Sequence, residues 1–118
     1  MKRVALLIFL MSTPVLAHDA EHPELNDWMM SLHNKGGGQC CDRQEALHLR
    51  DVDWESQNKP ESHFRVRIPI RPEGEVGWVD VPDGAVIDEP NKDGSTLVWP
   101  IYGPVGVTIQ CFILGAQG

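Results

Sequence analysis

Apolar side chains in the first part of the chain recur at the spacing of an α-helix. The residues with this spacing are Leu25, Trp28, Met29 and Leu32. Pro23 precedes them, at a place where a first helical turn tolerates proline. Asn34, Lys35 and three consecutive glycines then interrupt the pattern. The spacing therefore predicts one short helix over residues 23–34.

From residue 47 onward the pattern changes to the period of two that is typical of half-buried strands. Pro, Gly, Asp and Asn separate the alternating segments and are typical of turns. The predicted strands and short apolar segments cover residues 47–49, 52–54, 64–68, 76–81, 85–87, 96–102 and 107–113. Because the connections are short, we expect antiparallel pairing. The predicted fold class is α+β, mainly β, with one short N-terminal helix on a small antiparallel sheet or partly open barrel, stapled by a disulfide.

The first seventeen residues have the pattern of a secretory signal peptide. Lys2 and Arg3 precede an apolar run over residues 4–11, and Ala17 provides a small residue at a cleavage site. The run is shorter than the roughly 20 residues that span a bilayer, so we expect no stable membrane insertion after cleavage. An uncleaved N-terminal helix is the alternative. We therefore expect a cleaved segment over residues 1–17 and one small globular domain over 18–118, in the periplasm or secreted.

The chain is acidic, and cleavage makes it more so. It holds 17 Asp and Glu against 10 Lys and Arg, a net charge of −7. Removing residues 1–17 leaves 101 residues and takes away Lys2 and Arg3 but no acid, so the charge falls to −9. Such a surface repels phosphates and anionic headgroups, and we expect no binding to nucleic acid.

Three cysteines, Cys40, Cys41 and Cys111, follow the predicted signal peptide. In an oxidising compartment they are expected to form one intramolecular bridge and leave one thiol. The predicted bridge joins Cys41, or alternatively Cys40, to Cys111, and closing a loop of about 70 residues contributes roughly 4 kcal/mol. A bridge between the adjacent cysteines is a further alternative. The remaining thiol leaves two states open, a monomer and a disulfide-linked dimer.

Two histidines near the predicted cleavage site form a candidate metal site. If cleavage follows Ala17, the new α-amine and the imidazole of His18 form a chelate suited to Cu(II), with His22 as a further ligand. No other cofactor is expected. Five later acids do not have the spacing of a calcium loop and are interpreted as turn residues. They are Asp80, Asp83, Asp88, Glu89 and Asp93.

Alternation along the segment 63–67 predicts a basic stripe on one strand face. His63, Arg65 and Arg67 share this face, and Arg71 continues it beyond the strand. The stripe is a candidate surface for an anionic partner; the alternative is a solvated strand face. The four tryptophans, in contrast, lie within apolar patterns and are predicted to be core residues. They are Trp28, Trp54, Trp78 and Trp99.

The sequence contains no convergent set of acid, base and nucleophile, and no catalytic residue is predicted. We therefore expect a non-catalytic binding or envelope accessory protein, not an enzyme, with an unknown protein partner in the cell envelope. One alternative is periplasmic copper or zinc binding through His18. Another is a cysteine-based enzyme or redox protein, because Cys40 and Cys41 lie near His33 and His48 in the sequence.

Several sequence blocks carry a resemblance to a known family. They are His22-Pro23-Glu24-Leu25 with Trp28 and Leu32, the glycine run into Cys40-Cys41-Asp42, Asp51 to Glu55, Phe64 to Ile68, Gly77-Trp78-Val79-Asp80-Val81-Pro82, Val98 to Tyr102 and Cys111-Phe112. Together they resemble a family of small exported, functionally uncharacterised proteins of alphaproteobacteria. The resemblance implies export but no activity, cofactor or catalytic residue. Related proteins often carry another cysteine shortly after the Cys-Cys pair, where this chain has Arg43 to Ala46.

Overall fold

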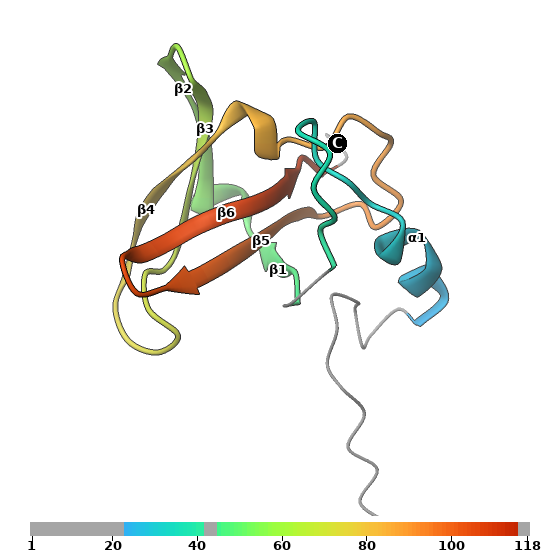
Figure 1. Ribbon diagram of the computed structural model, residues 1–118, viewed down its shortest axis with the longest axis horizontal. Coiled ribbons are helices and arrows are strands. Elements are labelled where there is room, and N and C mark those ends of the chain that lie inside the picture. Colours follow the sequence, from blue (N-terminus) through green and yellow to red (C-terminus); the bar gives the residue numbers. More distant parts are fainter. Residues whose placement is uncertain (1–22, 42–44, 116–118) are drawn as a thin grey trace, which may run out of the picture.

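A computed structural model describes residues 23–41 and 45–115. The described elements, in chain order, are a 3₁₀ turn (Pro23–Leu25), α1 (Asn26–Met30), β1 (Leu47–Leu49), a 3₁₀ turn (Asp51–Asp53), β2 (Trp54–Lys59), β3 (Ser62–Pro69), β4 (Val76–Val81), a 3₁₀ turn (Asp83–Ala85), β5 (Thr96–Gly103) and β6 (Gly106–Ile113) (Figure 1). None of the described helices is long and apolar enough to cross a membrane. The predicted signal peptide, residues 1–17, lies outside the described residues.

The strands form two antiparallel sheets of three strands each. The first sheet has the order β1-β5-β6 and the second the order β2-β3-β4. Both contain a hairpin made by consecutive strands, β5 with β6 and β3 with β4. The predicted mainly β fold with antiparallel pairing and one short N-terminal helix is therefore confirmed.

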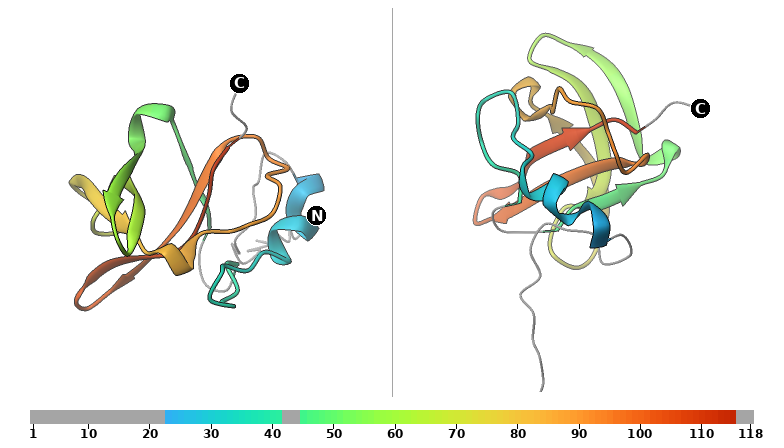
Figure 2. Two further views of the ribbon diagram at one scale, coloured as in Figure 1. Left: turned by 90° about the horizontal axis from the view of Figure 1, so that it is seen from above. Right: turned by 90° about the vertical axis from the view of Figure 1, so that its right-hand side faces the viewer.

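The two sheets and the N-terminal segment lie in three layers, with the first sheet in the middle (Figure 2, left). One face of the first sheet packs on the second sheet, where Val98 and Phe112 meet Val66 and Val81. The opposite face carries Leu97, Trp99, Cys111 and Ile113, and it packs on Trp28, Met29 and Leu32 of the N-terminal segment. The alternation of neighbouring residues in β5 and β6 between two buried faces explains the consecutive apolar residues over 97–101 of β5 and 111–113 of β6.

A β-bulge attaches the N-terminal segment to the first sheet. Trp99 pairs with Cys111 but Pro100 pairs with Ile109, which leaves Gln110 as an additional residue in β6. Asn34 Nδ2 donates a hydrogen bond to the Gln110 carbonyl at 2.7 Å. Pro100 has no N–H to donate, so a bulge is a position where a central strand tolerates it. The freed backbone of the bulge therefore becomes the docking point of the segment.

The helix predicted over residues 23–34 is shorter in the structure. Residues 23–25 form a 3₁₀ turn and α1 ends at Met30. The N–H and the hydroxyl of Ser31 both donate to the carbonyl of Trp28, at 3.0 and 2.6 Å, which tightens the last turn. The chain then folds back on itself, because His33 pairs with Gln39 in an isolated bridge. Gly37 makes this reversal possible with a φ of +91°.

Candidate binding face on the second sheet

The second sheet has one buried and one solvent-facing side. Along β3, Val66 and Ile68 point into the core, while Arg65 and Arg67 alternate with them and point outward. Arg65 pairs across the sheet with Glu55 of β2 and Asp80 of β4, and Arg67 pairs with Trp78. We call this side the outer face. Its residues used below are Asp53, Glu55, Arg65, Arg67, Val76, Trp78 and Asp80.

Carboxylates flank both arginines of the outer face. Arg65 forms an ion pair with Glu55 through Nε and Nη2. Arg67 donates from Nε and Nη2 to Asp53 Oδ1, at 2.9 and 2.8 Å. Asp53 also accepts from Arg50 Nε at 2.9 Å. Hydrogen bonds from Arg50 and Arg67 hold the pKa of Asp53 below its usual value.

The third carboxylate of the outer face, Asp80, lies on β4 and contacts two side chains of β2. Gln57 Nε2 and Lys59 Nζ each lie 3.0 Å from its oxygens. The hydrogen bonds from Gln57 and Lys59, in that order, lower the pKa of Asp80. Basic and acidic side chains therefore alternate on the outer face. The carboxylates neutralise most of the positive charge of the basic stripe that was expected from the sequence.

Trp78 lies on β4, an edge strand of the second sheet, and is 39% exposed. The guanidinium carbon of Arg65 lies 4.4 Å from the centroid of the indole ring, and that of Arg67 lies 5.6 Å from it. Both distances are within the range of a cation–π interaction. The ring is thereby held in place although it is not part of the core.

The prediction that all four tryptophans are core residues is therefore wrong for Trp78. Trp28 and Trp99 are buried as predicted, with 8% and 0% of their surface exposed, and Trp54 is half-buried. Trp78 shares its strand parity with Val76 and Asp80, both exposed, whereas Val81 has the opposite parity and is buried. The alternation in β4 could have predicted its outward position. The prediction instead followed the hydrophobic character of tryptophan, which suggests burial.

Two hollows border the outer face. One, of about 430 Å³, is lined by Arg50, Asp53, Arg67 and Val76. The other, of about 480 Å³, is lined by Lys59, Pro60, Glu61, Ser62, Asp80 and Pro82. Since Asp53 and Arg67 contribute to the first hollow and Asp80 to the second, the face continues into a depression at either side.

The other predicted partner-binding residues lie apart from Trp78 and its two arginines. His63 is the second residue of β3, and its Nδ1 lies 2.8 Å from Asp83 Oδ1. The hydrogen bond from His63 lowers the pKa of Asp83. Arg71 is exposed in the loop between β3 and β4 and lines a different hollow, together with Tyr102. The structure thus brings Arg65 and Arg67 together, and sequence reasoning missed Trp78, Asp53, Glu55 and Asp80 as their neighbours.

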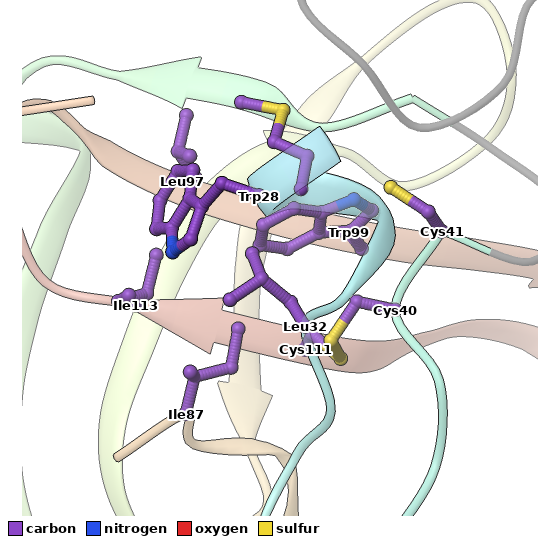
Figure 3. Packing of buried hydrophobic residues seen from close by; sticks show 10 residues of the cluster. Trp28, Leu32, Cys40, Cys41, Ile87, Leu97, Trp99, Cys111 and Ile113 are labelled. Carbon is purple, nitrogen blue, oxygen red and sulfur yellow. A yellow bond between two sulfur atoms is a disulfide. The ribbon is translucent and has the colours of Figure 1, made fainter. Parts of the chain in front are cut away.

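The disulfide joins Cys40 to Cys111, with a Cα–Cα distance of 5.6 Å and a sequence separation of 71. The predicted pairing of Cys41 with Cys111 is wrong, and the Cys40 alternative is correct. The N–H of Cys40 donates to the carbonyl of Leu32 at 3.1 Å, which holds the two arms of the folded-back N-terminal segment together. The sulfur of Cys41 points away from the bridge (Figure 3).

Cys41 remains a buried thiol with 4% of its surface exposed. Burial raises its pKa to about 11, although a hydrogen bond with Trp99 acts in the opposite direction. A thiol with this pKa is almost entirely protonated at neutral pH, and the thiolate is the nucleophilic form. The site therefore lacks the electrostatics of an activated cysteine.

The candidate metal ligands His18 and His22 lie outside the described residues. Within residues 23–41 and 45–115, no three His, Cys, Asp or Glu side chains are grouped so as to hold a metal ion. Among the acids interpreted as turn residues, Asp93 has this role, because its carboxylate accepts hydrogen bonds from the N–H and hydroxyl of Ser95.

Comparison of the chain with protein-family models, curated proteins and solved structures finds no match. The resemblance to the exported alphaproteobacterial family stays a prediction from sequence. The candidate site is therefore defined by its own geometry: an exposed indole on an antiparallel sheet, contacted by two guanidinium groups that form ion pairs with carboxylates.

Proposed function

We propose that the protein is a non-catalytic binding protein of the cell envelope and that it acts through the outer face of the second sheet. The observation that carries this proposal is the position of Trp78. A large indole is 39% exposed on a regular strand, while cation–π contacts with Arg65 and Arg67 hold its orientation. Tryptophan and arginine are the residue types that contribute most to recognition surfaces, because they combine large contact area with polar groups.

The layer arrangement supports the same surface. Both faces of the first sheet are covered, one by the second sheet and one by the N-terminal segment. In the described part of the chain, other elements cover one of the two faces of the second sheet. The other face carries Trp78 and the exposed Val76. An ordered sheet face positions side chains more rigidly than a loop, so little conformational entropy is lost when a ligand binds.

The properties of the cysteines support a role without catalysis. Cys40 and Cys111 are consumed in the disulfide. Burial raises the pKa of Cys41 to about 11, so its thiol is a poor nucleophile near neutral pH. This chemistry favours binding over the cysteine-based enzyme that the sequence left as an alternative.

Retention by isolated cell envelopes tests the proposal. We expect the envelope fraction of the source bacterium to retain the purified protein, and Trp78→Ala to reduce retention at least about tenfold. Met30→Ala is the matched control, because Met30 is 38% exposed and lies on the N-terminal layer, at the opposite side of the molecule. Equal retention of the wild type and both variants, with unchanged thermal unfolding, would contradict the proposal.

A further inference from the structure

The outer face presents hydrogen-bond donors and acceptors side by side. Arg65 and Arg67 use Nε and Nη2 for their carboxylate partners, so each Nη1 amino group lies outside these ion pairs. The side chains of Arg65 and Arg67 are 38% and 39% exposed, and those of Glu55 and Asp80 are 45% and 49% exposed. A ligand that both donates and accepts hydrogen bonds therefore meets complementary groups at neighbouring positions.

The charges of the face disfavour a strongly ionic ligand. The three carboxylates of Asp53, Glu55 and Asp80 face the cations of Arg50, Lys59, Arg65 and Arg67 across short ion pairs. An anion would meet these carboxylates and the field of a chain with a net charge of −7. A cation would meet the four basic side chains. A face of alternating ion pairs best fits a ligand without net charge.

The indole of Trp78 adds an apolar plane to this polar surface. Arg65 and Arg67 lie over the ring at 4.4 and 5.6 Å, and the residue as a whole is 39% exposed. An aromatic plane of this kind packs against flat aliphatic C–H surfaces. A pyranose ring with equatorial substituents has such a surface, with hydroxyl groups at its rim that donate and accept.

We infer that the outer face binds an uncharged oligosaccharide. One sugar ring stacks on Trp78, and its hydroxyl groups form hydrogen bonds with Arg65, Arg67, Glu55 and Asp80. This inference rests on the proposed function and specifies its ligand. The hollows beside Val76 and beside Asp80 extend the face at both sides of the stacked ring. They provide room for neighbouring sugar units of a chain.

The composition of the face favours this ligand over a protein partner. The buried centres of protein–protein interfaces are depleted in Lys, Glu and Asp. Here Glu55 of β2 and Asp80 of β4 both pair with Arg65 across the sheet, and Asp80 lies on the same strand as Trp78. Covering these groups with an apolar protein surface would remove water from them without replacing its hydrogen bonds, which is unfavourable. Sugar hydroxyls replace those bonds.

Titration of the full, disulfide-bonded protein with a short uncharged β-1,4-linked N-acetylglucosamine oligomer tests the inference. We expect ¹H–¹⁵N NMR shifts confined to β2, β3, β4 and the Trp78 indole, with a Kd on the order of millimolar. Trp78→Ala should weaken binding about tenfold and Trp78→Phe less, because phenylalanine keeps a smaller aromatic plane. Met30→Ala should bind as the wild type does. Binding should change little with ionic strength, since no net charge is neutralised.

Two NMR outcomes would overturn the inference: no shifts up to about 50 mM oligomer, or shifts that Trp78→Ala leaves intact. Equal or tighter binding of an anionic oligogalacturonate would overturn it as well. So would self-association in a sedimentation experiment that Trp78→Ala abolishes. A protein partner would appear differently. Envelope retention would then be lost after protease treatment of the envelopes and would resist excess oligosaccharide. In that case the proposed function would stand and the carbohydrate ligand would be wrong.

Discussion

Asp93 shows how one buried carboxylate organises a loop. Its side chain is 3% exposed, its oxygens accept from the N–H and hydroxyl of Ser95, and His48 Nε2 lies 3.4 Å from it. Burial acts to raise its pKa, but the hydrogen bonds from Ser95 and the charge of His48 outweigh this effect, so the pKa of Asp93 lies below 3.8. The ionised form is thus the one that stabilises the fold.

We therefore predict that Asp93→Ala lowers the free energy of unfolding at pH 7 by about 1–3 kcal/mol. Because the pKa is depressed, this contribution is present above the unfolded-state pKa of about 4 and is lost as the pH falls through the folded-state value. The difference between variant and wild type should accordingly shrink in urea unfolding near pH 3. Asp88→Asn is the control, since that side chain is 73% exposed and its loss should change stability by less than about 0.5 kcal/mol. A difference that persists undiminished in acid would contradict this account.

The buried thiol of Cys41 leads to a second prediction at this scale. With a pKa near 11, its thiolate fraction at neutral pH is about a hundredfold smaller than that of an ordinary exposed cysteine. We expect iodoacetamide to label the native protein at least that much more slowly than the protein unfolded in guanidinium, as measured by mass spectrometry. A monomer on a non-reducing gel should accompany this result. Rapid native labelling, or a covalent dimer that Cys41→Ser abolishes, would show that the thiol is accessible.

Sequence reasoning at the residue scale succeeded where one local pattern decides the outcome. The alternation around Val66 placed Arg65 and Arg67 correctly on one outward face. It failed for Trp78, because the large apolar surface of tryptophan suggested burial although its strand parity indicated the outer face. The choice between Cys40 and Cys41 could not be made from spacing, since it depends on which sulfur the docked segment presents to Cys111.

At the scale of elements, the disulfide and the bulge hold the N-terminal segment on the first sheet. Cys40 bonds Cys111 beside the bulged Gln110, whose carbonyl accepts from Asn34. We predict that the double variant Cys40→Ala, Cys111→Ala loses about 4 kcal/mol of stability, because the closed loop is long. Hydrogen exchange should rise first in residues 28–41, while the amides of β3 and β4 keep their protection. Cys41→Ala serves as the control and should leave the exchange pattern unchanged. Uniform loss of protection in both sheets would contradict a separately attached layer.

Strands β3 to β6 were predicted well, but β2 was not predicted beyond Trp54, residues 52–53 lie in a 3₁₀ turn, and the helix was predicted too long. Alternation bounded by turn residues is a local property, so the segments that became β3 to β6 were visible in the sequence. Leu32 extends the helical pattern of Leu25 and Trp28, yet it reaches the core from a loop after Ser31 ends the helix. The division into two sheets and the bulge depend on pairing between distant strands, which no local pattern encodes.

The described residues form a stack of three layers, and side-chain exposure rises from the first sheet to the outer face of the second sheet. Phe112, at 0% exposure, lies between the sheets and contacts Phe64 at a ring separation of 5.2 Å. Val76, at 55% exposure, lies on the outer face of the second sheet. β6 is covered on both faces and β4 on one face, so the difference between the two substitutions reports the order of the layers.

We predict that Phe112→Ala costs about 3–5 kcal/mol, a large part of the 5–15 kcal/mol typical of a small domain. Val76→Ser should change the free energy of unfolding by less than about 0.5 kcal/mol, because the outer face is already hydrated. Chemical denaturation of the two variants measures both values. A large loss for Val76→Ser would mean that another part of the chain, or a second copy, covers the outer face in solution. The outer face would then not be available to a ligand. A recognition surface at Trp78 therefore requires that Val76→Ser lower the free energy of unfolding only slightly.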